Sequence, residues 1–175
     1  MFIGREEELN FLEDRYNSAD GQLVVLYGRR RVGKTELLRQ FCEHKEHVFY
    51  TCTEIIDEKQ LEAFSQRVLE KNKQAAKYIT RFSDWEQALL SITELAKDKK
   101  IVVVIDEFPY MVKGNNAIPS ILQKLWDEVL KQSNVMLILC GSAMSFIEKE
   151  ALAEKNPLYG RATGCLLYTS DAADE

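Results

Sequence analysis

Three short runs of apolar residues stand out in the chain, at residues 23–27, 101–105 and 135–139. Each run is rich in Val, Ile or Leu and has no polar alternation, which is typical of a central parallel strand buried on both faces. Polar stretches with helical spacing separate the runs. Strands that alternate with helices predict an α/β fold, in which helices cover both faces of a parallel sheet in three layers.

The intervening segments predict the remaining elements. A fourth strand is expected at residues 48–53. Capping signals that begin at Asp57 and Ser83 predict helices running to residues 78 and 97. Apolar residues recur at helical spacing over 118–130, and we expect this stripe to face the core rather than a partner. Further helices are expected at residues 6–16, 34–42 and 143–150.

The first apolar run leads directly into a P-loop pattern, G-x-x-x-x-G-K-[ST]. The pattern comprises Gly28, Arg29, Arg30, Arg31, Val32, Gly33, Lys34 and Thr35. Its glycines let the backbone bend so that successive N–H groups face phosphates at the N-terminus of the next helix. Lys34 is expected to reach the β- and γ-phosphates, and Thr35 to ligate Mg²⁺. The alternative is a glycine-rich turn with an incidental lysine, which the strand before and the helix after disfavour. We therefore predict that residues 28–36, Glu36 included, bind a nucleoside triphosphate.

The second apolar run ends in two consecutive acids, Asp106 and Glu107, as in a Walker B motif. Ligands of open α/β sheets bind at the carboxyl ends of the strands, so these acids should lie beside the P-loop. Consecutive side chains at a strand end cannot face the same way, which predicts a division of roles. Asp106 would hold Mg²⁺ through water, and Glu107 would act as the general base on the attacking water. The alternative is a solvated acidic turn.

The third apolar run leads to Ser142. A hydroxyl at this strand end can contact the γ-phosphate or the attacking water, which would make Ser142 part of the catalytic set. Serine is also a favoured N-cap, so Ser142 could equally cap the helix expected at 143–150.

Two absences favour ATP over GTP as the nucleotide. No D-x-x-G motif follows the P-loop at a useful distance, and residues 72–75 read Asn-Lys-Gln-Ala, without the aspartate of a guanine-reading N-K-x-D motif.

Several further motifs accompany the P-loop in a consistent order. They are Phe2-Ile-Gly-Arg-Glu at the start, Asp106-Glu-Phe-Pro-Tyr, Ile118-Pro-Ser-Ile-Leu-Gln with Trp126-Asp127, Cys140-Gly-Ser, and Pro157-Leu-Tyr-Gly-Arg161. Over residues 1–164 the chain resembles the archaeal-type ATPases of archaea and bacteria, P-loop ATPases related to the AAA+ and STAND groups. The resemblance implies binding and hydrolysis of ATP.

The same resemblance implies positions for two further segments. The Gly4-Arg5 segment would pack near the adenine. Arg161 would act in catalysis, close to the phosphates or facing a neighbouring subunit, and the second placement would need a homo-oligomer. Similar family members continue into a winged-helix segment and a nuclease-like C-terminal region, and neither is present here.

The last residues do not resemble the family. Residues 165–175 read Cys-Leu-Leu-Tyr-Thr-Ser-Asp-Ala-Ala-Asp-Glu. A transposase-type sequencing adapter encodes this peptide in one reading frame, whereas the alternative is a genuine polar tail. We therefore expect a truncated ATPase domain at 1–164 that lacks its last core strand, followed by a segment that is not native.

The overall charge does not indicate a nucleic-acid surface, because the formal net charge is −5. DNA binding would then depend on the missing C-terminal region. No apolar run is long enough to cross a membrane and no signal peptide opens the chain, so no membrane partner is expected. The four cysteines show no paired spacing, which is typical of free thiols in a reducing compartment. We expect a cytoplasmic protein.

These observations favour Mg²⁺-dependent hydrolysis of ATP that drives a change in the missing region. One alternative is a regulatory switch that binds ATP tightly and turns over rarely. Another is a DNA-associated ATPase.

Overall fold

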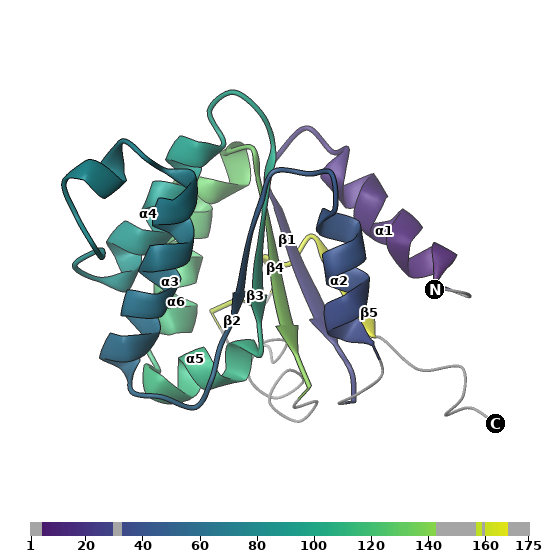
Figure 1. Cartoon of the computed structure of the whole chain (residues 1–175). Helices are drawn as coiled ribbons and strands as arrows, with labels where there is room; N and C mark the ends of the chain where they lie inside the picture. The colour runs from purple at the N-terminus through teal and green to yellow at the C-terminus, as the bar shows by residue number, and fades with distance from the viewer. Residues whose placement is uncertain (1–4, 30–32, 143–156, 159, 168–175) are drawn as a thin grey trace.

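The computed structural model describes residues 5–29, 33–142, 157–158 and 160–167. Its elements follow in the order α1 (Glu6–Tyr16), β1 (Gln22–Tyr27), α2 (Lys34–Cys42), β2 (His47–Thr51), α3 (Asp57–Lys71), η1 (Ala75–Lys77), α4 (Trp85–Leu95), β3 (Ile101–Asp106), α5 (Phe108–Gly114), α6 (Ile118–Glu128), η2 (Leu130–Gln132), β4 (Val135–Gly141) and β5 (Gly164–Leu167). The expected alternation of strands and helices is confirmed (Figure 1).

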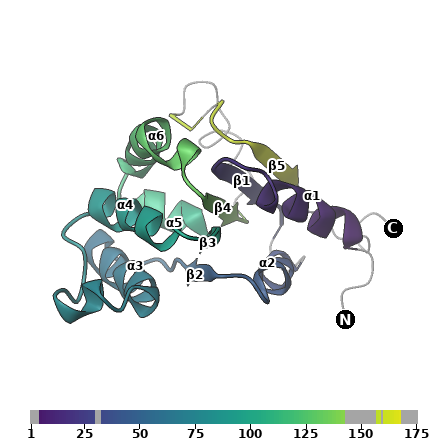
Figure 2. The ribbon, with the colours of Figure 1, turned by 90° about the horizontal axis from the view of Figure 1, so that it is seen from above.

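The strands form one parallel sheet in the order β2-β3-β4-β1-β5. Helices α3 to α6 cover one face and helices α1 and α2 cover the other (Figure 2). The predicted three-layer α/β architecture is therefore confirmed. Because the strands are parallel, β1, β3 and β4 bring their carboxyl ends to the same edge of the sheet.

Two apolar clusters, one on each face, account for the unbroken apolar runs. In β3, Val103 and Ile105 belong to the larger cluster, with α3 to α6, while Val102 and Val104 belong to the smaller one, with α1 and α2. All four side chains are buried completely. Alternate residues of a strand point to opposite faces, so a strand buried on both faces needs apolar residues throughout.

Several predicted helix boundaries were wrong. Asp57 is the first residue of α3 and not its cap, and α4 ends at Leu95 and not at residue 97. Helix α3 ends at Lys71 and not near residue 78, because the side chain of Asn72 accepts a hydrogen bond from the N–H of Ala75 and begins a separate short turn. The N-cap of α4 is Asp84 and not Ser83, since the Asp84 carboxylate accepts a bond of 2.8 Å from Gln87 N–H.

The short helix α5 was not predicted. Pro109 stands in its first turn, where the missing proline N–H costs no hydrogen bond. The helix expected at 143–150 lies outside the described residues. No helix in the described part of the chain is both long enough and apolar enough to cross a membrane.

The loss of the native last core strand stays a prediction, although residues 164–167 form a strand, β5, at the edge of the sheet. Strand β5 pairs with β1 in parallel register, from Val24 opposite Gly164 to Tyr27 opposite Leu167. Leu166 packs against the smaller apolar cluster. Strand β1 is therefore not an edge strand. Pairing uses backbone groups that every residue except proline carries, so the pairing does not decide whether residues 165–167 are native.

Candidate nucleotide-binding site

The P-loop connects β1 to α2, as predicted. Gly33 is the N-cap of α2 and has a φ of 94°, in the left-handed region that glycine enters without steric cost. The Lys34 side chain is buried, and its Nζ donates to the carbonyls of Gly28, at 2.9 Å, and Arg29, at 2.5 Å. The ammonium group thus lies folded against the loop that should hold the phosphates.

Only some of the other predicted P-loop residues lie in the described part of the chain. Arg29 and Glu36 are exposed, whereas Arg30, Arg31 and Val32 lie outside the described residues. At the start of the chain, Gly4 also lies outside them. Arg5 forms an ion pair with Glu8 at 3.5 Å, one turn along α1.

Thr35 and Asp106 meet directly, which joins the two Walker motifs. Thr35 Oγ1 donates to Asp106 Oδ2 over 2.8 Å. Asp106 is only 2% exposed, and its other carboxylate oxygen accepts the N–H of Glu107 at 2.9 Å. The buried carboxylate is therefore held at both oxygens.

This pair of oxygen-bearing side chains fits Mg²⁺, which prefers hard oxygen ligands and is usually held by one or two protein groups together with substrate phosphates. Within the described ranges no group of three or more His, Cys, Asp or Glu side chains forms a metal cage. Thr35 and Asp106 would hold the ion, with the remaining ligands supplied by phosphate and water.

Glu107 turns away from Asp106, as the division of roles requires. Its φ of 54° and ψ of 40° are left-handed, an uncommon conformation for a residue with a side chain. Ser142 Oγ donates to the Glu107 carboxylate, with distances of 3.3 and 3.2 Å to its two oxygens. Strand β4 thus places the predicted hydroxyl against the predicted base.

Two cysteines near Asp106 were not placed in the site from the sequence. Burial, followed by the negative charge of Asp106, raises the pKa of Cys140 well above its ordinary value and that of Cys52 as well. Both thiols therefore stay protonated. Cys52 N–H also donates to the Asp106 carbonyl over 2.8 Å. Only the strand order could have identified them, because Cys52 follows β2 and Cys140 lies in β4, the two neighbours of β3.

Arg161 is not placed near the phosphates of this chain. It precedes β5, and Thr163 N–H donates to Leu23 O over 2.7 Å, near the amino end of β1. The P-loop follows the carboxyl end of that strand, about 20 Å away at roughly 3.3 Å per residue. The guanidinium instead forms a two-bond pair with Asp127, at 3.1 and 2.9 Å, and donates to Pro157 O. A parallel β5 requires this placement, because the residues before such a strand lie at the amino end of the sheet.

The fold and the joined Walker motifs define a P-loop ATPase-type domain. The chain matches the family described as an ATPase domain found predominantly in Archaea, over residues 2–173. It belongs to this family, which confirms the resemblance seen in the sequence.

Three relatives illustrate the match. The chain is 37% identical over 166 residues to protein MJECL04 of Methanocaldococcus jannaschii, covering 95% of this chain and 35% of that one. Among solved structures, the Walker-type ATPase PABY2304 of Pyrococcus abyssi aligns with a TM-score of 0.69 and 26% identity, over 95% of this chain and 53% of that one. The ORC1 protein of Aeropyrum pernix, solved in complex with DNA, aligns with a TM-score of 0.67 and 15% identity, over 97% and 46% of the two chains. The chain therefore spans about a third to a half of the length of these proteins.

Proposed function

We propose that this domain hydrolyses ATP to ADP and phosphate with Mg²⁺, and that hydrolysis drives a change in a C-terminal region beyond the domain. The observation that carries the proposal is the separation of Asp106 from Glu107. One carboxylate faces Thr35 of the P-loop and the other faces Ser142. Family membership supports ATP as the nucleotide.

Each residue would contribute one step. The Lys34 ammonium would exchange its two carbonyl partners for oxygens of the β- and γ-phosphates, and so offset negative charge there. Glu107 would accept a proton from water as the water oxygen bonds to the γ-phosphorus. The bond from that phosphorus to the β,γ-bridging oxygen then breaks, and ADP leaves. Thr35 and Asp106 would hold Mg²⁺, which neutralises phosphate charge when bound.

A slow switch remains the second candidate, and one observation favours it. Lys34 and Glu107 already have hydrogen-bond partners within the protein, in the P-loop carbonyls and the Ser142 hydroxyl. Hydrolysis of ATP would require Lys34 to exchange these partners for phosphate oxygens and Glu107 to exchange its partner for the attacking water. If that exchange is slow, the domain would hold ATP for long periods and signal through the bound state.

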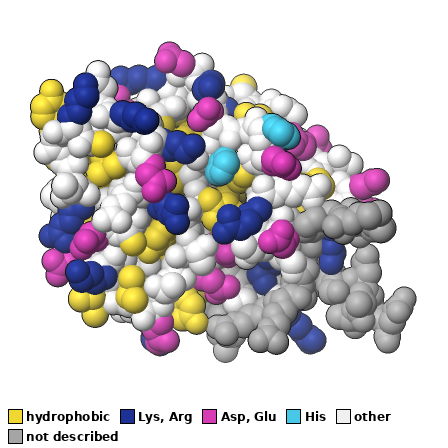
Figure 3. Space-filling view, in the orientation of Figure 1, with side chains coloured by type: hydrophobic (Ala, Val, Ile, Leu, Met, Phe, Trp, Pro, Cys, Tyr) yellow, Lys and Arg dark blue, Asp and Glu magenta, His cyan; other side chains and the backbone are white. Residues whose placement is uncertain are grey.

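A DNA-associated role has less support. The structural match to ORC1 is at 15% identity and concerns the fold alone. On the face shown in Figure 3, acidic side chains lie among the basic ones and no continuous basic stripe is visible.

Release of phosphate from ATP tests the proposal. The full-length protein should release phosphate from ATP with Mg²⁺, and EDTA should stop that release. Glu107→Gln should bind ATP with unchanged affinity yet hydrolyse it about 10² to 10⁴ times more slowly, the usual contribution of a general base. Glu94→Gln, an exposed substitution on α4, is the matched control and should behave as wild type. Equal hydrolysis rates for Glu107→Gln and wild type would reject Glu107 as the general base. A wild-type protein that binds ATP tightly without hydrolysing it would favour the regulatory switch.

A further inference from the structure

Strand β2 forms an open edge of the sheet. It comes first in the strand order and pairs only with β3 within the described part of the chain. The opposite edge ends in β5, so β1 is paired on both sides. An unpaired strand edge presents a row of backbone donors and acceptors that another extended chain can use.

The register shows which backbone groups face outward. At the two ends of the β2–β3 pair, Val102 N–H donates to Glu46 O over 3.0 Å and Cys52 N–H donates to Asp106 O over 2.8 Å. In a parallel pair, the residues whose backbone groups face the partner alternate along the strand. Even-numbered residues therefore face β3, and the N–H and C=O groups of His47, Phe49 and Thr51 face away from the sheet.

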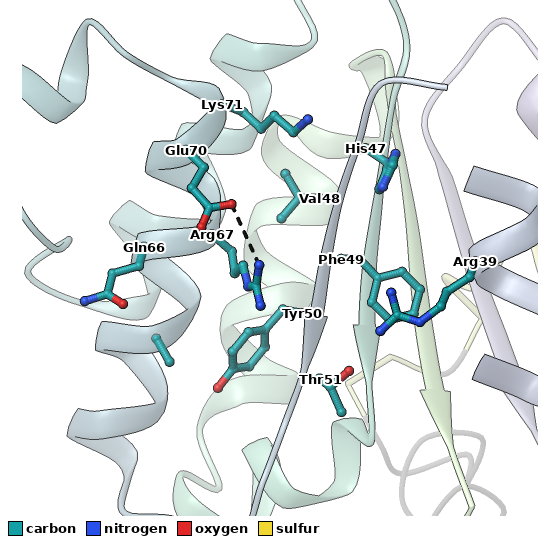
Figure 4. A pocket seen from close by; sticks show the side chains of 11 residues that line it. Arg39, His47, Val48, Phe49, Tyr50, Thr51, Gln66, Arg67, Glu70 and Lys71 are labelled. Carbon is teal, nitrogen blue, oxygen red and sulfur yellow. Dashed lines mark ion pairs between the residues drawn. The ribbon is translucent and has the colours of Figure 1, made fainter. Parts of the chain in front are cut away.

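A groove of about 590 Å³ runs along this edge. One wall comes from α3, through Gln66, Arg67, Glu70 and Lys71, and the other comes from Arg39 of α2. Figure 4 shows these side chains on the two sides of β2. The Arg39 guanidinium lies over the Phe49 ring, 4.4 Å from its centroid. The groove therefore combines a strand edge with polar side chains from two helices.

The charge of the groove is positive, although the whole chain has a net charge of −5. Three cationic side chains line it, Arg39, Arg67 and Lys71, against one carboxylate, Glu70. Arg67 and Glu70 form an ion pair at 3.8 Å, and both side chains are more than half exposed, which makes the pair weak. Arg39 and Lys71 have no carboxylate partner among the described residues. Two cations are thus left to meet a negatively charged partner.

We propose that the edge of β2 binds an extended segment of a partner protein that carries acidic side chains at alternate positions. Such a segment would add a strand to the sheet and satisfy the outward backbone groups of β2. Alternate side chains of a strand share one face, so its carboxylates would lie together on the α3 face, near Lys71. The five residues of β2 span about 17 Å at roughly 3.3 Å each, enough for a short linear motif.

The chemistry of the groove disfavours two other occupants, a nucleic acid and a second copy of this chain. Outward C=O groups need hydrogen-bond donors, which a peptide backbone supplies at the right spacing and a nucleic-acid phosphate does not. A second copy of this chain would bring two cationic grooves together, and the like charges would repel each other.

Peptide binding by the full chain tests the proposal. The probe is a fluorescein-labelled synthetic peptide in which valine and glutamate alternate, compared by anisotropy with the same peptide carrying lysine in place of glutamate. Thr51→Pro removes one outward N–H at a position where an edge strand tolerates proline, and Thr51→Val, which keeps the N–H, is its matched control. We expect Thr51→Pro to weaken binding of the acidic peptide about fivefold to tenfold, and Thr51→Val to leave it unchanged.

A second pair of variants tests the charge. Lys71→Glu reverses a charge in the groove, whereas Lys59→Glu makes the same change elsewhere on α3. Lys71→Glu should weaken binding of the acidic peptide about tenfold, and Lys59→Glu should have little effect. If melting curves show that Thr51→Pro does not fold, His47→Pro at the start of β2 replaces it.

Three results would overturn the proposal. The first is an acidic peptide that fails to bind at millimolar concentration or binds no better than the basic one. The second is binding of labelled oligothymidylate that Lys71→Glu abolishes and Thr51→Pro leaves intact, which would assign the groove to nucleic acid. The third is a wild-type dimer, seen by sedimentation velocity, that Thr51→Pro dissociates, which would assign the edge to a second copy.

Discussion

Thr35 and Asp106 stand 71 positions apart in the chain, yet their side chains share a hydrogen bond of 2.8 Å. Asp106 ends β3 and Thr35 lies in α2, which follows β1. Strand β4 lies between β3 and β1, so the contact spans the end of β4. Helix α2 makes this possible, because its first turn extends from the P-loop over the carboxyl ends of the strands. The contact joins the phosphate-binding loop to the second acidic motif within a single chain.

The position of Lys34 predicts a defect in nucleotide binding. Lys34→Ala removes a buried ammonium group that can exchange the carbonyls of Gly28 and Arg29 for phosphate oxygens. A charge-assisted hydrogen bond contributes about 1.5–3 kcal/mol, so calorimetry should show ATP affinity about 10- to 100-fold weaker. Lys59→Ala, on the exposed surface of α3, is the control. Equal affinity for Lys34→Ala and wild type would reject the P-loop assignment.

The contact between Ser142 and Glu107 predicts an effect on chemistry and not on binding. Ser142→Ala removes a hydroxyl that donates to the Glu107 carboxylate, so the base should become less well positioned. We expect the single-turnover rate of hydrolysis to fall about tenfold, in line with one hydrogen bond, while the affinity for ATP stays unchanged. Ser91→Ala, which removes a hydroxyl within α4, should alter neither quantity. A Ser142→Ala variant that loses ATP affinity would indicate a contact with the nucleotide instead.

The pair of Arg161 and Asp127 predicts a pH-dependent contribution to stability. The hydrogen bonds from Arg161 hold the pKa of Asp127 below its ordinary value of 3.8. A carboxylate whose pKa is lowered by folding stabilises the fold above its ordinary pKa and loses that contribution as the pH falls through the lowered value. Urea titrations should therefore show Arg161→Gln less stable than wild type at neutral pH, with the difference vanishing in acid. A difference independent of pH would show that the pair does not act through the charge of Asp127.

The distance of Arg161 from the P-loop limits its catalytic role to a neighbouring subunit. If Arg161 serves such a site, the hydrolysis rate per chain should rise with protein concentration in the wild type and stay flat in Arg161→Lys, which cannot make the same two-bond contact. A wild-type rate that does not depend on concentration would argue against this role.

Strand β5 predicts that Leu166 stabilises the fold. Its side chain packs against the smaller apolar cluster beside β1. Leu166→Asp should lower the free energy of unfolding by about 1–3 kcal/mol, because a carboxylate would replace apolar contacts. Leu166→Val keeps most of those contacts and should cost less than about 1.5 kcal/mol. Urea denaturation that does not distinguish Leu166→Asp from wild type would indicate that β5 is not docked in solution.

The origin of residues 165–175 can be tested on the gene. We propose that these residues are translated adapter sequence, on the ground of their match to an adapter over the whole segment. Amplification of the gene from source DNA, with a primer upstream of the codon for Gly164, should give a different continuation. Recovery of the same codons would show that the segment is native.

Local patterns along the chain were enough to predict several features of the fold and the site. Apolar runs without alternation predicted β1, β3 and β4, because a strand buried on both faces consists mainly of apolar residues. The spacing from Gly28 to Thr35 predicted the P-loop, since the bend and the helix start need glycine at fixed positions. The acids at the end of the second run predicted two carboxylates with separate partners, and the structure has that arrangement.

The contacts between groups that are distant in the chain could not be predicted from local patterns. Asp127 and Arg161 each lie in a family motif, but nothing local indicates that they pair at the amino end of the sheet. The positions of Cys52 and Cys140 around Asp106, and the open edge of β2, follow from the strand order. Strand order arises from the packing of the whole sheet, in which each strand's neighbours come from distant parts of the chain. A pattern read within one segment therefore cannot specify them.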